Sequence, residues 1–402
     1  MKLVSPKRRL SRLLVTLALA LCGQQALAQV SDDVVKIGFL SDLSGGASAL
    51  SGESTAEAVR MAIEDMGGEV LGAPVELLVA DQLNKPDVGL AIAREWFDTE
   101  QVDLLLDVNS SAVALAVNDL AQERNRVFVT GSSAAELVGE RCAITTTEWI
   151  ADTKTLSRSI AAPLVAEGFD NWFFITIDYA FGHALEEEAS KSIEAGGASI
   201  VGSVSHSPQT TDFSSFLLEA QARGAQTLAL ATFGTHTTNI IKQAREFGLD
   251  VKIVPFFLSL VDIKAIGQEN LADTYSSTSF YWNRNEASRA WAARFQERWE
   301  RAPTFANAQH YSSTLHYLKA VKAAGTDEAQ AVAKAMHDMP IEDETGIVAY
   351  LREDGRVVRE MYSFKVKTPD QSESEWDVME IIATLPGDQA APPLEESGCA
   401  YE

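Results

Sequence analysis

The feature that most constrains the fold of this chain is an alternation of short apolar strands with helical segments, which occurs twice. In the first run the expected strands cover residues 34–40, 75–80, 102–106 and 127–130, with helices at 56–66, 88–97 and 112–123. In the second run the strands cover residues 172–177, 199–204, 227–232 and 251–256, with helices at 183–194, 213–223 and 237–247. Short apolar strands that alternate with helices predict parallel sheets covered by helices on both faces. Two such runs predict an α/β protein of two similar lobes, each a doubly wound parallel sheet.

The last third of the chain does not repeat this pattern. Its expected elements are amphipathic helices at 285–301, 311–324 and 329–338, and a β-hairpin of residues 347–351 and 357–366 around an Asp-Gly turn. Since these elements must pack on the lobes, the economical interpretation is a hinge that the chain crosses several times. We expect lobe one to hold residues 29–148 and about 283–345, lobe two 149–282 and about 346–385, and a C-terminal tail 386–402.

The first 28 residues have the pattern of a secretory signal. A basic stretch around Arg8 and Arg9 precedes the apolar run Leu13 to Leu21, which is too short to span a bilayer. The segment 26–28 is a small-x-small cleavage site, so we expect cleavage after Ala28 and export. A lipoprotein would instead use Cys22, but the residue before it is a leucine, where such signals usually need a small residue.

Charge and cysteine content restrict the partners and the compartment. The formal net charge is −24, and loss of the basic leader makes the mature chain more acidic still, so nucleic acid and anionic membrane surfaces are poor partners. Once the leader is removed, Cys142 and Cys399 form an even pair in an oxidising compartment. We expect a disulfide that holds the tail to the body, and the alternative is two separate thiols.

The sequence offers no catalytic or metal-binding motif. It contains no G-x-S-x-G, H-E-x-x-H, C-x-x-C, G-x-G-x-x-G or P-loop pattern, and its six histidines lack metal-ligand spacing. We therefore expect no metal, no cofactor and no enzymatic activity, although catalytic groups can lie far apart in sequence.

Three loops at strand ends in the first lobe are rich in small polar residues. They cover residues 41–46, 109–111 and 130–133. Such loops meet at one edge of an open parallel sheet. Hydroxyls and free backbone N–H groups at a helix start attract anions, so these loops could hold a ligand carboxylate without Lys or Arg. The alternative interpretation is that the serines only cap helices.

The matching loops of the second lobe carry aromatic residues instead. They are Asp178–Gly182, Phe233–Thr235 and Phe256–Leu258, and Trp149 lies between the two lobes. Ligand pockets often combine apolar walls with a few polar anchors, so we expect lobe two to contact an apolar ligand body. The alternative is that these phenylalanines belong to the core, which alternation along the strand makes true of either Phe256 or Phe257.

The chain resembles the branched-chain amino-acid-binding protein family, the type I periplasmic receptors of ABC importers. The resemblance is carried by Lys36–Leu40 with Ser44 and Gly45, the helix 56–66, Asn109–Ser111, Asp178–Gly182 and Gln243–Leu249. It implies the type I periplasmic binding protein fold, with three crossovers, and a ligand buried by hinge closure. It also implies a periplasmic monomer that delivers a solute to ABC importer membrane subunits.

Transferred to this chain, the family's ligand-carboxylate site falls on Ser110 or Ser111, with Ser132 and Ser133, and its aromatic before glycine falls on Phe181. One departure matters for the ligand. The amino-acid binders carry an acidic side chain after the strand equivalent to 251–256, whereas the loop 255–260 here is Pro-Phe-Phe-Leu-Ser-Leu. A buried ammonium without a counter-charge costs several kcal/mol, so the resemblance favours a small organic carboxylate, including aromatic ones.

Several alternatives stay open. Asp262, slightly further on, would restore binding of a branched-chain or other amino acid or amide. The same fold could serve as a sensor for a membrane signalling partner, and a secreted α/β hydrolase is the third possibility. The residues expected to bind the ligand are Ser44, Leu50, Ser51, Asn109, Ser110, Ser111, Ser132, Ser133, Trp149, Phe181, Phe233, Thr235, Phe257 and Leu258.

Overall fold

The computed structural model describes residues 30–400. The expected signal segment, its cleavage site and Cys22 lie outside the described residues. Within that range, no helix has both the length and the apolar character that a membrane span requires.

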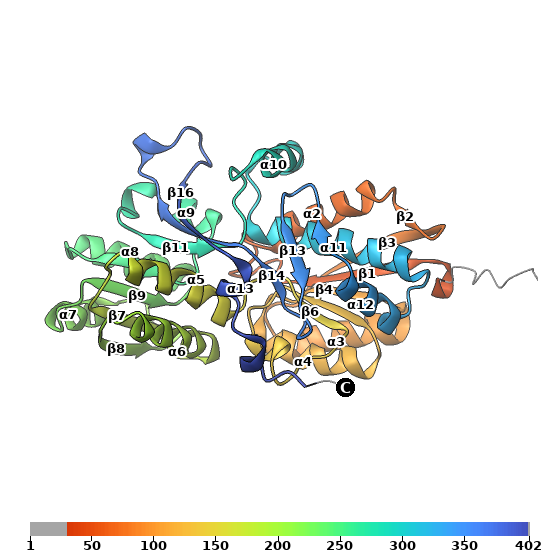
Figure 1. Cartoon of the computed structure of the whole chain (residues 1–402), viewed down its shortest axis with the longest axis horizontal. Coiled ribbons are helices and arrows are strands. Elements are labelled where there is room, and N and C mark those ends of the chain that lie inside the picture. Colours follow the sequence, from red (N-terminus) through yellow and green to blue (C-terminus); the bar gives the residue numbers. More distant parts are fainter. Residues whose placement is uncertain (1–29, 401–402) are drawn as a thin grey trace, which may run out of the picture.

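Lobe one is built on a sheet in the order β2-β3-β1-β4-β5-β6, in which all neighbouring strands run parallel except β2 and β3 (Figure 1). Its strands are β1 Val35–Ser41, β2 Glu69–Val70, β3 Ala73–Asp81, β4 Leu104–Asp107, β5 Val127–Thr130 and β6 Thr146–Glu148. Its helices in the first half of the chain are α2 Gly52–Asp65, α3 Pro86–Glu95 and α4 Ser111–Glu123.

Both faces of this sheet are covered. Ile37 and Phe39 pack with α2 and the later helices α10 Glu286–Trp299, α11 Phe305–Ala324 and α12 Ala329–Asp338. Leu40 and Leu105 point to the other face, where α3 and α4 pack. Gly38 permits a close contact there, because a Cβ at this position would lie 2.4 Å from the ring of Trp96.

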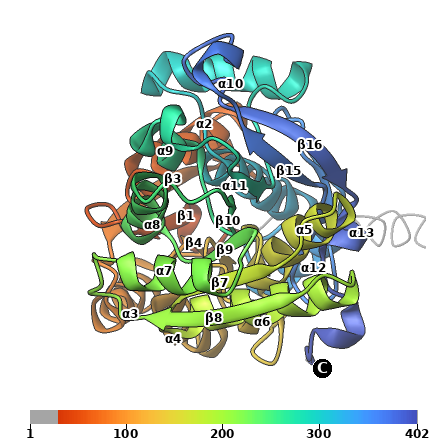
Figure 2. The same ribbon diagram turned by 90° about the vertical axis from the view of Figure 1, so that its left-hand side faces the viewer.

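Lobe two contains a parallel sheet in the order β10-β9-β7-β8, covered by α7, α8 and α9 on one face and by α5 and α6 on the other (Figure 2). Its strands are β7 Trp172–Ile177, β8 Ile200–His206, β9 Thr227–Ala231 and β10 Lys252–Pro255. Its helices are α5 Thr153–Ala166, α6 Ala180–Ala195, α7 Ser214–Ala222, α8 Gly234–Glu246 and α9 Leu260–Ile266. The predicted fold class, α/β with two parallel-sheet lobes, is confirmed.

An antiparallel sheet extends lobe two beyond β10. It has the order β11-β15-β16, formed by β11 Tyr275–Thr278, β15 Met361–Val366 and β16 Met379–Leu385. A single parallel bridge between Ile253 and Thr274 connects it to β10.

The late hairpin differs from its prediction. β12 Ile341–Glu342, β13 Val348–Leu351 and β14 Val357–Arg359 form a small antiparallel sheet that packs in the core of lobe one. The segment expected to form one strand over 357–366 divides at the exposed residue Glu360, after which β15 joins lobe two. The chain therefore returns to lobe two after Arg359, later than the position near 346 that we expected.

The chain passes between the lobes three times, after β6, after β11 and after β14. The tail adds a further connection. After β16 it forms α13 Gly387–Ala390 and ends beside lobe one, where Cys399 is disulfide-bonded to Cys142 with a Cα–Cα distance of 5.6 Å (Figure 1). The predicted disulfide is present, and it joins the chain end that follows lobe two to lobe one.

Candidate ligand-binding site

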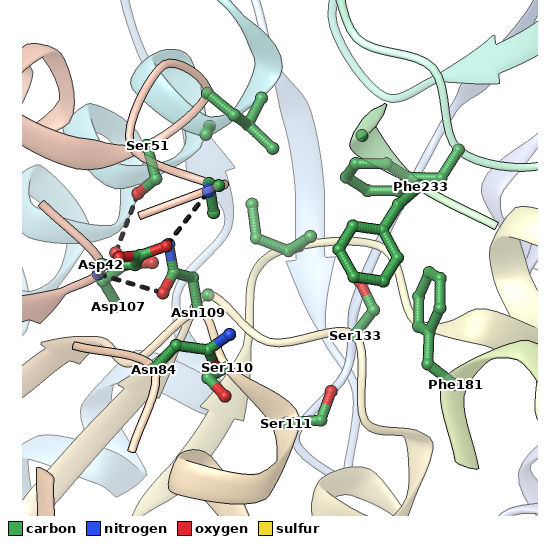
Figure 3. A pocket seen from close by; sticks show the side chains of 18 of the residues that line it. Asp42, Ser51, Asn84, Asp107, Asn109, Ser110, Ser111, Ser133, Phe181 and Phe233 are labelled. Atoms are coloured by element: carbon green, nitrogen blue, oxygen red, sulfur yellow. Dashed lines mark hydrogen bonds between the residues drawn. The ribbon is translucent and has the colours of Figure 1, made fainter. Parts of the chain in front are cut away.

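A cavity of about 380 Å³ lies between the lobes, at the carboxyl ends of the sheet strands. Lobe one contributes mainly polar side chains, and lobe two contributes phenylalanines from the opposite side (Figure 3). The predicted division into a polar and an aromatic wall therefore describes how the cavity is lined.

The loop after β1 is held by one carboxylate. Asp42, which is buried, accepts the backbone N–H of Gly45 at 2.8 Å through Oδ1 and that of Ala47 at 3.1 Å through Oδ2. This turn places Leu50 and Ser51 on the cavity wall.

Ser44 points elsewhere. Its hydroxyl donates to Asp81 at 2.6 Å on the exposed side of the loop, and it does not line the cavity. Of the residues that we expected in this loop, Leu50 and Ser51 reach the cavity and Ser44 does not.

The loop after β4 has an unusual backbone. Asp107 and Val108 both have positive φ, 76° and 52°, and a left-handed conformation is costly for a β-branched residue. The surrounding contacts hold it in place: Asn109 Oδ1 accepts from the Asp42 backbone N–H at 3.2 Å and from Gln82 at 2.5 Å. The loop thereby directs Asn109 and the start of α4 into the cavity (Figure 3).

The capping interpretation does not hold for Ser110. It occupies the N-cap position of α4, yet among the described residues its side chain makes no capping hydrogen bond. Ser110, Ser111 and Ala112 line the cavity, so the positive end of the α4 dipole faces the cleft. An uncapped helix start with two hydroxyls is suited to an anion.

The two serines after β5 have different positions. Ser132 is fully buried, donates to the Ser111 hydroxyl at 3.2 Å and accepts the Ala134 N–H at 3.1 Å, so it supports the wall from behind. Ser133 lines the cavity itself.

The aromatic wall consists of Tyr179, Phe181, Phe233 and Phe257. Phe181 makes edge-on contacts with Phe233 and Phe257, with ring centroids 5.7 and 6.2 Å apart. Phe233 and Tyr179 remain 36 % and 39 % exposed, so apolar surface is available in the cleft. Phe256 is the core residue of its pair, stacked on Phe174, and Phe257 is the cavity residue.

Three other expected residues lie outside the cavity. Trp149 is buried, donates its indole N–H to Thr147 at 3.1 Å and packs near His316 in lobe one. Thr235 is exposed on α8, and Leu258 belongs to the core of lobe two.

Sequence reasoning missed several lining residues. Asp42 and Asp107 lie at strand ends, so the rule that identified their neighbouring loops could also have found them. Phe305 and His310 come from the first turns of α11, far along the chain. Phe305 contacts Phe257 with ring centroids 5.9 Å apart and joins the two walls.

The charges at the cavity are mostly acidic. Among residues 30–400, the charged side chains that line it include Asp42, Asp107 and Asp262 but neither Lys nor Arg. Asp262 is the third residue of α9, where its Oδ2 accepts the backbone N–H of Ser259 at 2.8 Å and its hydroxyl at 2.5 Å. Burial raises the pKa of Asp262 above its ordinary value, and this cost would fall if a ligand cation approached. Burial also lowers the pKa of His236, so this lining imidazole is neutral at pH 7.

The chain forms two α/β lobes and passes between them three times, and a polar wall and an aromatic wall face each other across the cavity. This architecture defines the class of bilobed solute-binding proteins. Residues 34–373 match the sequence model of the periplasmic binding protein family, and the chain belongs to this family. Membership implies a periplasmic location and a role in solute binding for ABC transport.

Solved structures of the family superpose closely. A periplasmic binding protein from Burkholderia mallei is 40 % identical, with a TM-score of 0.87 over 92 % of this chain and 99 % of that one. A branched chain amino acid ABC transporter periplasmic ligand-binding protein from Burkholderia xenovorans is 37 % identical, with a TM-score of 0.86 over 91 % and 99 %. A solute binding protein of an ABC transporter from R. palustris, in complex with benzoate, shares the fold at 19 % identity, with a TM-score of 0.80 over 92 % and 100 %.

Proposed function

We propose that this protein captures a small organic carboxylate with an apolar or aromatic body between its lobes and delivers it to an ABC importer. The observation that carries the proposal is the uncapped start of α4, where Ser110 and Ser111 face phenylalanines across the cavity. A carboxylate there would accept backbone N–H and hydroxyl donors at the positive end of a helix. The apolar body would cover Phe181, Phe233 and Phe257.

The helix starts at the cavity support carboxylate binding without a salt bridge. The N-cap residues Tyr179 of α6 and Phe233 of α8 also make no side-chain cap within the described range, and both line the cavity. Three helix starts therefore direct partial positive charge into a cleft that has no Lys or Arg among the described lining residues. The R. palustris protein of this fold holds benzoate, so a cleft of this architecture accommodates an aromatic carboxylate.

A second candidate is an α-amino acid, and Asp262 favours it. The acidic side chain that the loop 255–260 lacks is supplied at the cavity by this residue, whose Oδ1 is not used in the Ser259 cap. A ligand ammonium beside Asp262 would be paired. The name of the Burkholderia xenovorans relative points to the same ligand class.

The remaining parts of the proposal concern location and assembly. Export would use the segment 1–28 with cleavage after Ala28, and the mature protein would act as a monomer on the importer subunits. The residues proposed to bind the ligand are the predicted ones that line the cavity: Leu50, Ser51, Asn109, Ser110, Ser111, Ser133, Phe181, Phe233 and Phe257.

A thermal-shift assay with three probes separates the candidates. Benzoate carries a carboxylate alone, leucinamide an ammonium alone, and L-leucine carries both. Binding at about 100 times Kd stabilises the folded protein by about 2.7 kcal/mol, which shifts the melting temperature by several degrees. A shift with benzoate and none with leucinamide supports the carboxylate proposal, and a shift with leucinamide alone contradicts it.

The variant Asp262→Asn distinguishes the two ligand classes. It should abolish a shift caused by L-leucine, because the ammonium loses its counter-charge, and leave a shift caused by benzoate unchanged. A benzoate shift that also disappears would mean that Asp262 has a role other than charge pairing.

A further inference from the structure

Two side chains at the lobe-one end of the cavity are fully buried and ionisable. Asp107, the last residue of β4, is 1 % exposed, and His310, on α11, is 0 % exposed. Asp107 Oδ1 lies 3.1 Å from His310 Nε2. Within residues 30–400 neither of these two atoms has a partner in a well-aligned hydrogen bond.

The other contacts of His310 determine where its protons lie. Its Nδ1 is 2.8 Å from the carbonyl oxygen of Ala306, one turn earlier in α11. A carbonyl oxygen only accepts, so Nδ1 carries a proton. If Nε2 were bare, two lone pairs would meet at 3.1 Å in the protein interior, whereas a proton between Nε2 and Oδ1 makes the contact attractive.

Asp107 also binds the neighbouring segments. Its Oδ2 accepts from the Ser51 hydroxyl at 2.8 Å, and its backbone carbonyl accepts from the Gly131 N–H at 2.5 Å. The approach of Gly131 is close, since a Cβ there would lie 1.9 Å from Asp107 Oδ1 and 3.0 Å from His310 Nε2. One side-chain pair thus contacts α11, the Ser51 loop and the Gly131–Ser133 loop, and Asp107 leads directly into the loop that carries Asn109.

We infer that Asp107 and His310 hold one shared proton and act as a positioning pair, which fixes the loops of the lobe-one wall relative to α11. The pair does not contact the ligand carboxylate in this role. It keeps Ser51, Ser110 and Ser133 in the arrangement that receives the ligand, and it holds the positive φ of Asp107 in place. This role rests on the proposed function of the cleft, whereas the shared proton is a property of the ligand-free protein.

The first test reads the proton directly. His316 lies on the same helix, is also buried, and has a ring nitrogen 2.9 Å from the Met336 carbonyl oxygen; burial lowers its pKa to about 4. In nitrogen NMR of the ligand-free protein at pH 7, with labelled histidine, His310 should have protons on both ring nitrogens and His316 on one. The variant Asp107→Asn should convert His310 to the singly protonated form. A singly protonated His310 in the unmodified protein overturns the inference.

The second test uses two matched variants. The side-chain amide of His310→Gln replaces Nε2 and can still donate to Asp107, whereas that of His310→Asn replaces Nδ1 and cannot reach it. Hydrogen exchange in residues 42–51, 109–111 and 131–133 should accelerate in His310→Asn and stay close to normal in His310→Gln and in the control His316→Asn. Acceleration throughout the protein, or equal acceleration in both His310 variants, would mean that the residue only stabilises the fold.

Ligand affinity gives the third reading and separates this inference from the proposed function. With benzoate or L-leucine as probe, His310→Asn should bind about tenfold more weakly than the unmodified protein and His310→Gln should stay within about threefold. If the unmodified protein binds neither probe, the proposed function fails for these ligands, while the NMR and exchange results still decide the pair. Equal affinity of both variants, with normal exchange, contradicts the positioning role.

Discussion

Replacing Cys142 and Cys399 together by serine removes the covalent link between the C-terminal tail and lobe one. In the folded protein the tail keeps other contacts, including an ion pair of Glu396 with Arg158 of α5 at 2.9 Å and a hydrogen bond from Arg352 to the Pro392 carbonyl at 2.7 Å. The variant should therefore fold with the tail in place. The main effect is on the unfolded chain, because the disulfide closes a loop with a sequence separation of 257 residues.

The size of the effect follows from loop closure. A cross-link across this separation restricts the unfolded ensemble by about 5 kcal/mol at 25 °C. We expect the double variant to lose about that much of its free energy of unfolding, measured by urea titration with tryptophan emission. Its unfolded chain is also more expanded, so the dependence on urea should steepen slightly.

A matched control separates the cross-link from the docking of the tail. Glu396→Gln breaks only the exposed ion pair with Arg158 and should cost less than about 1 kcal/mol. If the double serine variant also loses less than about 1 kcal/mol, the disulfide does not restrict the unfolded chain as reasoned here. If hydrogen exchange in the tail of the double serine variant becomes faster while its free energy of unfolding is unchanged, the disulfide only holds the tail in place locally.

Three further predictions concern buried and cavity groups. Glu148 is buried at the end of β6, and among the described residues neither of its carboxylate oxygens has a hydrogen-bond partner. Burial raises the pKa of Glu148 well above its ordinary value, so the folded state keeps this proton to a higher pH than the unfolded chain, and stability falls as the pH rises towards the folded-state pKa. Glu148→Gln should therefore raise the unfolding free energy at pH 8 by at least about 1 kcal/mol and flatten its pH dependence in thermal melts. A lower unfolding free energy of this variant at pH 8 would contradict the argument. Gly131→Ala places a Cβ against Asp107 Oδ1 and should cost about 1–3 kcal/mol of unfolding free energy in urea, with faster hydrogen exchange in the Asn109 loop. An unchanged unfolding free energy would mean that the loop can shift to accept the methyl group without cost. Phe181→Ala should weaken benzoate binding about tenfold in calorimetry, because an apolar contact is lost. The control Phe247→Ala removes an exposed ring just after α8 and should leave the affinity for benzoate unchanged. Equal effects of the two variants would contradict the aromatic wall.

The parallel sheets could be predicted because their strands are continuous apolar runs. β5 and β7 match the predicted residues 127–130 and 172–177, since both faces of these strands are buried. α5 was not predicted. Its sequence is rich in Ser and Thr and contains Pro163, so its helix propensity is low, although Leu156, Ile160 and Leu164 have helical spacing. Packing against α6 and the core of lobe two stabilises it instead.

The late hairpin shows a second kind of limit. Residues 357–366 form a continuous β pattern, but β14 pairs with β13 in lobe one and β15 pairs with β11 in lobe two. The partner of a strand depends on tertiary packing, and periodicity does not contain that information.

The residues of the candidate site could also be predicted only in part. The loops that follow strands could be located because parallel strands end at a common edge, and Ser110, Ser133 and Phe181 lie on the cavity as expected. The direction of each side chain was not predictable. Ser44 and Ser132 belong to these loops, but hydrogen bonds to Asp81 and Ser111 turn them away.

No local sequence pattern indicated that residues of α11 line the cavity. Phe305 and His310 reach the cavity because the chain crosses back to lobe one and lays this helix against α2. A crossover of this kind brings together segments that are separated by about 200 residues in the sequence, and only the assembled fold shows it.

The most direct test of the central claim is native mass spectrometry of the protein mixed with benzoate, beside the double variant Ser110→Ala, Ser111→Ala. The account predicts one bound carboxylate per chain in the unmodified protein and in the control Ser44→Ala, whose hydroxyl lies outside the cavity, and loss of that adduct in the double variant. A double variant that retains the carboxylate as well as the unmodified protein does would contradict the assignment of this wall of the cleft.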